Sequence, residues 1–383
     1  MNRKILIDVR PEQIQVALLE QDDLAEIYME SAEHQRIAGN IYRGKVKNVL
    51  PGMQAAFVDI GEGKNAFLYA GDIQPGREPC PPIQELLKTG QELTVQVVKE
   101  PVGTKGARIT TQITLPGKYL VLMPAVNYVG ISRRIENESE RQRLKSIAQT
   151  LKPESMGLIV RTEAFGKNAE DFAAELDFLT ELWAKIERGE RKGKVPRPLH
   201  REESILYRTV RDLFTGDMDQ LIVNRWEEYR KVSEWTDLLS PSLQERVKYF
   251  EPKRDLFAYF GVREQIERAA QRKIRLKSGG SLVLDPTEAL TVIDVNTDKY
   301  VGKVDLEDTV FHTNLEAAEE ITRQIRLRDI GGIIVIDFID MEVAENRLQV
   351  LEALKAALKR DRAKTNVVGF TGLGLVEMTR KKI

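Results

Sequence analysis

Two stretches of the sequence, Leu290-Thr-Val-Ile-Asp294-Val-Asn296 and Gly332-Ile-Ile-Val-Ile-Asp337, have the apolar pattern of buried strands, and an aspartate follows each apolar core. Residues 315–328 between them have a helical pattern, which Thr313 or Asn314 can cap. A strand, a helix and a second strand in succession favour parallel pairing of the two strands. We therefore expect the two aspartates to project from the carboxyl ends of neighbouring strands.

Carboxylates placed this close together indicate a divalent metal. Two carboxylates a few ångströms apart repel, and one of them takes up a proton unless a cation lies between them. Mg²⁺, with Mn²⁺ as an alternative, suits such oxygen ligands. A metal held by Asp294 and Asp337 can polarise a phosphodiester and activate a water, and Asn296 could hydrogen-bond a phosphate oxygen. The pattern therefore predicts phosphodiester hydrolysis.

The same acids are also compatible with a structural role or with a calcium-binding loop. An aspartate at a strand end is often only the point where a buried strand meets solvent, so a purely structural role stays open. The series Asp294-Val-Asn-Thr-Asp298 copies the opening of a calcium-binding loop. However, Lys299 replaces the glycine expected at the sixth position, and Asp305 replaces the glutamate expected at the twelfth. We reject the calcium loop.

The composition is that of a globular protein with several domains. The chain has 383 residues, of which 42% are hydrophobic and 31% charged, so about two to four domains are expected. The net charge of -1 lacks the basic excess typical of nucleic-acid binders, although residues 185–201 and 263–277 are locally basic. Cys80 is the single cysteine, and no apolar run is long enough for a signal peptide or a membrane span. We expect a cytoplasmic protein.

The order of patterns along the chain changes from strands to helices and back. Residues 1–30 have strand patterns, and about five short strands with glycine turns between residues 41 and 98 predict a small barrel. Residues 138–151 and 169–188 have helical patterns, and residues 189–198 are the clearest linker. The last region alternates strands and helices.

Long ordered blocks surround the two aspartates and continue upstream of them. These blocks are Val292-Ile-Asp-Val-Asn-Thr297, Thr313-Asn-Leu-Glu-Ala-Ala318, Ile325-Arg-Leu-Arg-Asp-Ile-Gly-Gly332, Ile334-Val-Ile-Asp-Phe-Ile-Asp-Met341, Ile131-Ser-Arg-Arg134 and Gly157-Leu-Ile-Val-Arg-Thr162. Together they resemble the ribonuclease E/G family of bacterial endoribonucleases. The resemblance implies a magnesium-dependent hydrolase that cuts single-stranded RNA in mRNA decay and rRNA processing. It would favour 5′-monophosphorylated substrates and leave 5′-phosphate and 3′-hydroxyl ends.

The resemblance also implies an α+β multidomain fold. Residues 1–35 and 205–269 would form a ribonuclease-H-like scaffold. Residues 36–112 would form an S1 domain of OB type, residues 113–204 a 5′ sensor, and residues 270–383 a DNase-I-like α/β subdomain with the catalytic centre.

The functional residues of the family fall on matching positions of this chain. The resemblance assigns Asp294, Asn296 and Asp337 to catalysis, with the two aspartates as metal ligands; Gly117, Val121, Arg161, Thr162 and Lys364 to 5′-phosphate binding; and Phe57, Phe67 and Lys105 to RNA binding. An arginine is usual in the family where Lys364 stands. Lysine keeps the charge but loses the bidentate geometry, so a weaker end preference is expected.

Partners follow from the same resemblance. Single-stranded RNA is the expected substrate, and a homodimer is the expected assembly. Family members continue into a Cys-Pro-x-Cys element in which two subunits share a zinc ion, but this sequence stops before it. Zinc and higher oligomers are therefore not expected. The alternative function is a non-catalytic S1-type RNA-binding protein, and a weaker third is a DNA nuclease.

Overall fold

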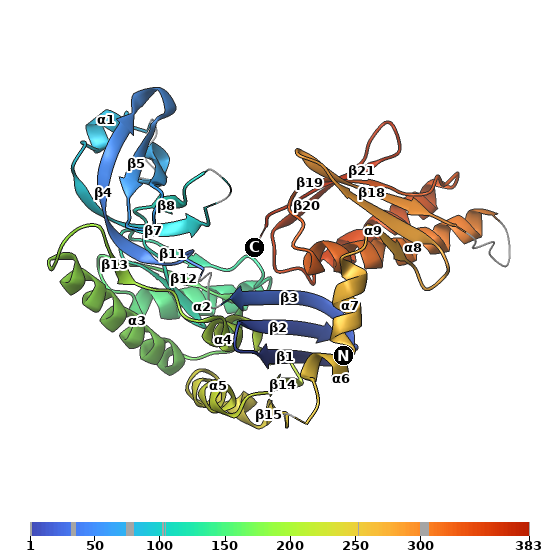
Figure 1. Ribbon diagram of the computed structural model, residues 1–383, viewed down its shortest axis with the longest axis horizontal. Coiled ribbons are helices and arrows are strands. Elements are labelled where there is room, and N and C mark those ends of the chain that lie inside the picture. The colour runs from blue at the N-terminus through green and yellow to red at the C-terminus, as the bar shows by residue number, and fades with distance from the viewer. Residues whose placement is uncertain are drawn as a thin grey trace. The chain divides into compact units, whose positions relative to one another are not determined.

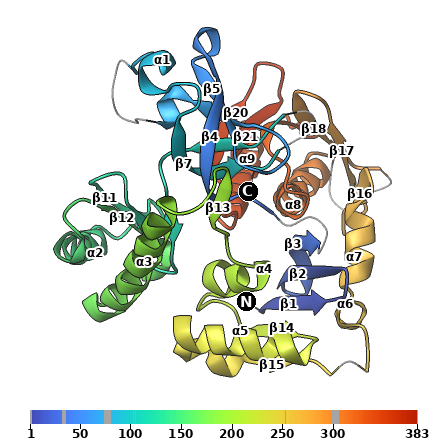
Figure 2. The same cartoon turned by 60° about the vertical axis from the view of Figure 1, so that its left-hand side comes forward.

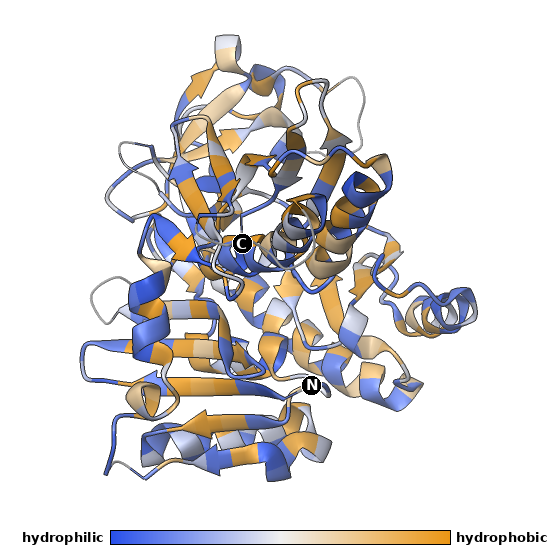
Figure 3. Cartoon of the chain, turned by 90° about the vertical axis from the view of Figure 1, so that its right-hand side faces the viewer, coloured by the Kyte–Doolittle hydropathy of each residue, from blue (hydrophilic) through white to orange (hydrophobic). Residues whose placement is uncertain are grey.

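The computed structural model describes residues 2–31, 36–73, 80–101, 103, 105–251, 253–298 and 306–382. The chain divides into two compact units: unit 1 contains Met1–Met29, Gly216–Ser233 and Ser242–Ile383, and unit 2 contains Glu30–Thr215 and Glu234–Pro241. Within the described residues the strands form four sheets, two in each unit. Apolar and polar residues are interspersed along the strands and helices (Figure 3).

The first sheet of unit 1 joins segments that lie far apart in the sequence. Its order is β15-β14-β1-β2-β3, with β1 (Arg3–Val9), β2 (Gln13–Glu20), β3 (Asp23–Ser31), β14 (Gln220–Val223) and β15 (Val247–Tyr249). Strand β1 pairs antiparallel with β2 and parallel with β14. The helices of this region are α5 (Trp226–Leu239), α6 (Leu256–Tyr259) and α7 (Val262–Ala269).

The second sheet of unit 1 carries the two aspartates. Its order is β16-β17-β18-β19-β21-β20, with β16 (Lys273–Arg275), β17 (Ser281–Pro286), β18 (Leu290–Asn296), β19 (Gly332–Asp337), β20 (Thr365–Phe370) and β21 (Val376–Arg380). Helices α8 (Leu306–Leu327) and α9 (Ala344–Leu358) lie side by side along one face of this sheet (Figure 1). The fully buried apolar side chains of β18 and β19, Ile293, Ile334 and Ile336, point into this layer.

A closed barrel forms the first part of unit 2. Strands β4 (Ile41–Leu50), β5 (Ala55–Asp59), β6 (Ala66–Tyr69), β8 (Arg108–Thr110) and β7 (Glu92–Lys99) follow one another, and β7 pairs back onto β4. The short helix α1 (Ile83–Leu86) lies against β4 (Figure 2). Strand β13 (Arg197–His200) adds to β4 from outside the barrel. The barrel predicted from the short strand patterns is confirmed, and its closure is consistent with an OB-like fold.

The second sheet of unit 2 has the order β11-β12-β10-β9. Its strands and helices are β9 (Leu115–Pro116), β10 (Leu120–Met123), β11 (Val129–Ile131), β12 (Gly157–Val160), α2 (Glu138–Leu151) and α3 (Ala169–Glu190). Asn137 caps α2, and Asn168 with Asp171 forms a capping box at the start of α3. Helix α4 (Ile205–Arg208) continues directly into a π-helical turn, Thr209–Leu213.

Two boundaries expected from the sequence are wrong. Thr313 and Asn314 do not cap α8, because the helix already includes Leu306 and both side chains lie buried inside it. Residues 189–198 are only partly a linker, because α3 continues to Glu190 and β13 begins at Arg197. Over the part of the chain that the structure describes, no helix combines the length and apolarity needed to cross a membrane.

Candidate active site

Asp294 and Asp337 lie side by side on parallel strands. They are direct register partners of β18 and β19, which places their backbones about 4.8 Å apart. Their chain neighbours Ile293 and Ile336 are fully buried on the helix-covered face. Because successive side chains of a strand point to opposite faces, both carboxylates project from the other face of the sheet.

The electrostatic environment of Asp337 is consistent with a carboxylate of Asp294 nearby. Partial burial raises the pKa of the Asp337 carboxyl, and the negative charges of Asp294 and Asp340 raise it further. The side-chain amide of Asn296 donates a hydrogen bond to Asp294 Oδ2 at 2.7 Å. The structure therefore brings all three expected catalytic residues to one edge of one sheet.

These oxygens fit a hard divalent cation. A carboxylate whose pKa is raised by a neighbouring negative charge, as for Asp337, is stabilised by a cation bound beside it. Mg²⁺ typically takes one or two carboxylates and fills its other positions with water and substrate oxygens. Among the described residues, no three His, Cys, Asp or Glu side chains gather in a metal-binding cluster. By their register pairing, Asp294 and Asp337 could hold a divalent ion whose other positions would be filled by water and phosphate oxygens.

Asn314 of α8 supports the strand end that carries Asp337. Its buried amide donates to the backbone carbonyl of Ile339 at 2.8 Å and accepts from the backbone N–H of the same residue at 3.1 Å. This double contact fixes the segment that follows β19. The sequence interpretation considered Thr313 or Asn314 as a helix cap and missed this role, because Ile339 lies 25 residues away from Asn314.

Four of the five residues expected to bind a 5′-phosphate lie in unit 2. Arg161 directly follows β12 and donates to the carbonyl of Gly117, and the hydroxyl of Thr162 is 3.0 Å from that of Ser132. Val121 lies on β10, which pairs with β12. Lys364 is exposed in unit 1, so the structure does not test its part in the pocket.

The backbone around Gly117 is held by a partly buried carboxylate that sequence reasoning missed. Glu175 of α3 accepts hydrogen bonds from the backbone N–H groups of Lys118, Tyr119 and Leu120. A Cβ atom on Gly117 would lie 2.5 Å from the carboxyl carbon of Glu175, so a larger residue there would displace this carboxylate. Lys118 is itself buried, and its ammonium donates to the carbonyl of Phe214 at 3.1 Å; burial lowers its pKa to about 8.

A chain of alternating charges leads to Arg161. Its guanidinium lies 2.7 Å from Asp212, which lies 2.8 Å from Arg211, which in turn lies 3.0 Å from Glu202. Burial alone would raise the pKa of Asp212, but hydrogen bonds and charges from Arg211 and Arg161 hold it below its ordinary value. Asp212 is therefore an anion that orients Arg161. Asp212 and Arg211 belong to the π-helical turn, which no sequence pattern had indicated.

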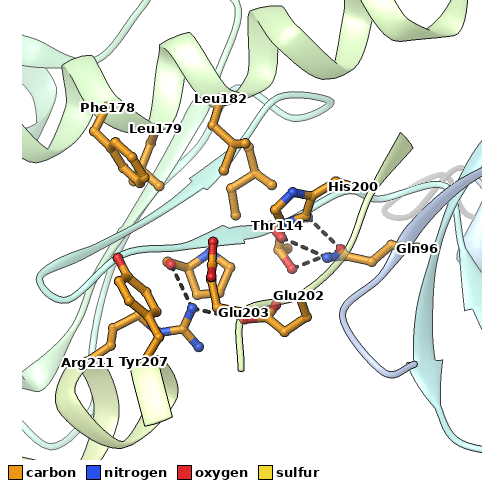
Figure 4. A pocket seen from close by; sticks show the side chains of 12 residues that line it. Gln96, Thr114, Phe178, Leu179, Leu182, His200, Glu202, Glu203, Tyr207 and Arg211 are labelled. Atoms are coloured by element: carbon orange, nitrogen blue, oxygen red, sulfur yellow. Dashed lines mark hydrogen bonds and ion pairs between the residues drawn. The ribbon is translucent and has the colours of Figure 1, made fainter. Parts of the chain in front are cut away.

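Arg211 and Glu202, the last two residues of this series of ion pairs, line a small pocket (Figure 4). Arg211, Tyr207 and Glu202 lie on one side of it, and Phe178 and Leu182 of α3 face them. Its volume of about 20 Å³ has room for about one water molecule. The pocket is too small for a nucleotide, and we do not assign it to the functional site.

The barrel presents aromatic side chains on its outer surface. Phe57 and Phe67 are register partners on β5 and β6, and their ring centroids are 5.6 Å apart. Both are partly exposed, whereas Ala56 and Val58, which flank Phe57, are fully buried. Lys105 is exposed in the segment before β8. The two phenylalanines therefore lie on the outer face of the barrel and not in its core.

Comparisons with known proteins bear on all of these regions. A model of the ribonuclease E/G family matches residues 114–383. Ribonuclease G of Escherichia coli strain K12 is 44% identical over 100% of this chain and 80% of its own length. Ribonuclease G of Haemophilus influenzae is 44% identical over 99% of this chain and 79% of its own length. Ribonuclease E of Nostoc sp. is 41% identical over 100% of this chain and 56% of its own length.

The chain belongs to the ribonuclease E/G family. Membership confirms the resemblance inferred from the sequence blocks. The segment matched by the ribonuclease E/G model contains the aspartate pair, Asn314 and the residues around Arg161, and begins after the barrel. The identity with ribonuclease G extends the relationship over the barrel as well.

Proposed function

We propose that this chain is a Mg²⁺-dependent endoribonuclease that hydrolyses single-stranded RNA. The observation that carries the proposal is the register pairing of Asp294 with Asp337 on parallel strands, in a member of a family of ribonucleases. These two carboxylates would hold the ion, and Mn²⁺ would suit the same ligands. The bound ion would polarise the scissile phosphodiester and lower the pKa of the attacking water.

The side chains around the pair would position the substrate. Asn296 uses one amide hydrogen to hold Asp294, and its second amide hydrogen is available to a phosphate oxygen. Asn314 keeps the end of β19 in place through Ile339. Water would attack phosphorus and the 3′-oxygen would leave, so the products would carry 5′-phosphate and 3′-hydroxyl ends.

The proposal extends to recognition of the 5′ end. Arg161 offers a fork of donors and Thr162 offers a hydroxyl, a combination that suits a terminal dianionic phosphate. Gly117 and Val121 would line the same pocket, and Lys364 would add a further positive charge. A 5′-monophosphorylated RNA would therefore be cut in preference to one with a 5′-hydroxyl end.

The barrel would bind the body of the RNA. Phe57 and Phe67 would stack bases, and Lys105 would contact the backbone. Stacking on an aromatic ring tolerates any base, because every base has a flat π face.

Each of the segments named from the resemblance would have one role in binding or cleaving RNA or in supporting the fold. Residues 36–112 would act as the S1 domain, residues 113–204 as the 5′ sensor and residues 270–383 as the DNase-I-like subdomain. Residues 1–35 and 205–269 would form the ribonuclease-H-like scaffold. The enzyme would work in the cytoplasm, as a homodimer, in mRNA decay and rRNA processing.

Substitution of the two aspartates tests the proposal. Asp294→Asn and Asp337→Asn keep the size of each side chain but remove the charges that would hold the metal, so cleavage of a 5′-monophosphorylated single-stranded RNA with Mg²⁺ should fall by about 100-fold or more. Binding of the same RNA in EDTA, measured by fluorescence anisotropy, should not change. Asp285→Asn, an exposed aspartate on β17, is the matched control and should cleave like the unchanged protein.

Three results would overturn parts of the proposal. Unchanged cleavage in both aspartate variants would remove the acids from the reaction. Tight binding of RNA by the unchanged protein without any cleavage would favour a non-catalytic S1-type RNA-binding protein. Equal cutting of a DNA oligonucleotide with the same sequence would make the chain a general nuclease.

A further inference from the structure

We infer that Tyr69 and Arg108 form a further base-binding subsite on the barrel, beside the two phenylalanines. This inference rests on the proposed RNA-binding role of the barrel. The resemblance to the family assigns no function to either residue. Its ligand would be a nucleobase of single-stranded RNA, taken without sequence preference.

The strand register places these side chains on one continuous face. Asn48, Phe57, Phe67 and Arg108 are successive register partners across β4, β5, β6 and β8. Tyr69 follows Phe67 by two residues on β6, so it lies on the same face one step along the strand. The aromatic surface therefore extends beyond the pair that the resemblance identifies.

The rings are close enough to form one surface. The centroids of Phe67 and Tyr69 are 4.4 Å apart with an interplanar angle of 71°. Tyr69 is 43% exposed although it touches Phe67. Contact with Phe67 alone does not require Tyr69 to be exposed. Stacking on a base does require one face of its ring to be accessible.

Arg108 has the geometry of a fixed stacking plane. Its guanidinium carbon lies 5.0 Å from the centroid of the Tyr69 ring. Asp72 holds the guanidinium through both of its oxygens, with the shortest contact at 2.8 Å from Nη2 to Oδ2. The side chain of Arg108 remains 41% exposed.

The ion pair between Arg108 and Asp72 favours binding of an RNA base over binding of a phosphate. Asp72 accepts from both Nε and Nη2 of Arg108, so this edge of the guanidinium is not available to a phosphate, whereas its flat face can stack on a base. The subsite should therefore contribute stacking and little to the salt dependence of binding.

Equilibrium binding of a 5′-hydroxyl RNA of about 12 nucleotides, a length that an OB fold can accommodate, tests the inference in EDTA. Tyr69→Leu keeps an apolar side chain but removes the aromatic face, and should weaken binding about fivefold or more. Tyr69→Phe should bind like the unchanged protein. The fivefold ratio should persist as the salt concentration rises, and it should disappear with an abasic RNA of the same length.

The control is Tyr128→Leu, which changes another exposed tyrosine of unit 2 and should leave binding unchanged. Circular dichroism of each variant shows whether the barrel stays folded. If Phe57→Ala weakens binding and Tyr69→Leu does not, this inference is wrong and the proposed function stands. If neither substitution matters, the barrel face does not bind RNA, and the wider proposal for the barrel fails with it.

Discussion

At the scale of single residues, Arg161 depends on a partner that no local pattern indicates. Asp212 lies 2.7 Å from Nη2 of the Arg161 guanidinium, and the carbonyl of Gly117 accepts a hydrogen bond from Nη1. Arg211 forms a second ion pair with Asp212 and so restricts the position of its carboxylate. A phosphate that approaches Arg161 would therefore meet a guanidinium that is already oriented, and preorganised donors bind with a smaller loss of side-chain entropy.

Asp212→Asn should reduce the preference for 5′-monophosphorylated RNA. The substitution removes the charge that orients Arg161, so the ratio of kcat/KM for 5′-phosphate over 5′-hydroxyl RNA should fall by about three- to tenfold. The change should appear in KM for the phosphorylated substrate, with kcat for the 5′-hydroxyl substrate unchanged.

Asp177→Asn, an exposed aspartate of α3, provides the control for this experiment. A stronger preference in Asp212→Asn would mean that Asp212 competes with the phosphate for Arg161 instead of orienting it.

At the scale of elements, the chemistry depends on the packing of α8 against the end of β19. Asn314 is fully buried in α8, and its amide satisfies both backbone groups of Ile339. Asp337 precedes this anchored residue by two positions, so the anchor limits where its carboxylate can lie. Small displacements of a catalytic group reduce rates strongly, because the reacting atoms must be aligned.

Asn314→Ala should lower kcat by about tenfold or more and leave the affinity for RNA in EDTA unchanged. It should also destabilise unit 1 by about 1–3 kcal/mol, because the partly buried N–H and carbonyl of Ile339 lose their hydrogen-bond partner. Single-turnover cleavage and urea unfolding measure the two effects. Asn366→Ala on the exposed side of β20 is the control, and loss of RNA affinity in Asn314→Ala would instead indicate general disorder of the sheet.

At the scale of the whole molecule, buried charges join the N-terminal sheet of unit 1 to its C-terminal layer. Glu26 of β3 lies 2.9 Å from Arg326 of α8 and 2.8 Å from Arg362, which precedes β20. The side chains of Glu26 and Arg326 are 5% and 4% exposed. Burial alone would raise the pKa of Glu26, but the two arginines lower it to about 2.

The stability of unit 1 should therefore depend on pH in the acid range. Because the pKa of Glu26 falls on folding from its ordinary value of 4.5 to about 2, its contribution is complete above pH 4.5 and is lost as the pH falls towards 2. Glu26→Gln should destabilise the protein by about 2–3 kcal/mol at pH 7, because Arg326 and Arg362 lose a shared carboxylate and Glu20 still pairs with Arg326.

Urea unfolding at pH 7 and at pH 3 measures this contribution, and the difference between the two proteins should shrink at pH 3. Glu352→Gln, an exposed glutamate of α9, should behave like the unchanged protein at both pH values. Equal stability of Glu26→Gln and the unchanged protein at pH 7 would contradict the prediction.

The sequence predicted those features that depend on near neighbours in the chain. Apolar spacing indicated the barrel strands and helices α2, α3 and α9, because the period of a strand or helix is visible within ten to twenty residues. The strand–helix–strand order also indicated the parallel pairing of the two aspartate-bearing strands, because the handedness of such connections leaves few alternatives.

By itself, the sequence determined the family, the barrel and the two strands that carry Asp294 and Asp337. Only the tertiary structure decided which distant groups support them: Asp212 beside Arg161, Asn314 on Ile339, and Arg108 over Tyr69. The reason is physical. Secondary structure follows from local backbone and side-chain preferences, whereas contacts between distant residues exist only after the elements have packed.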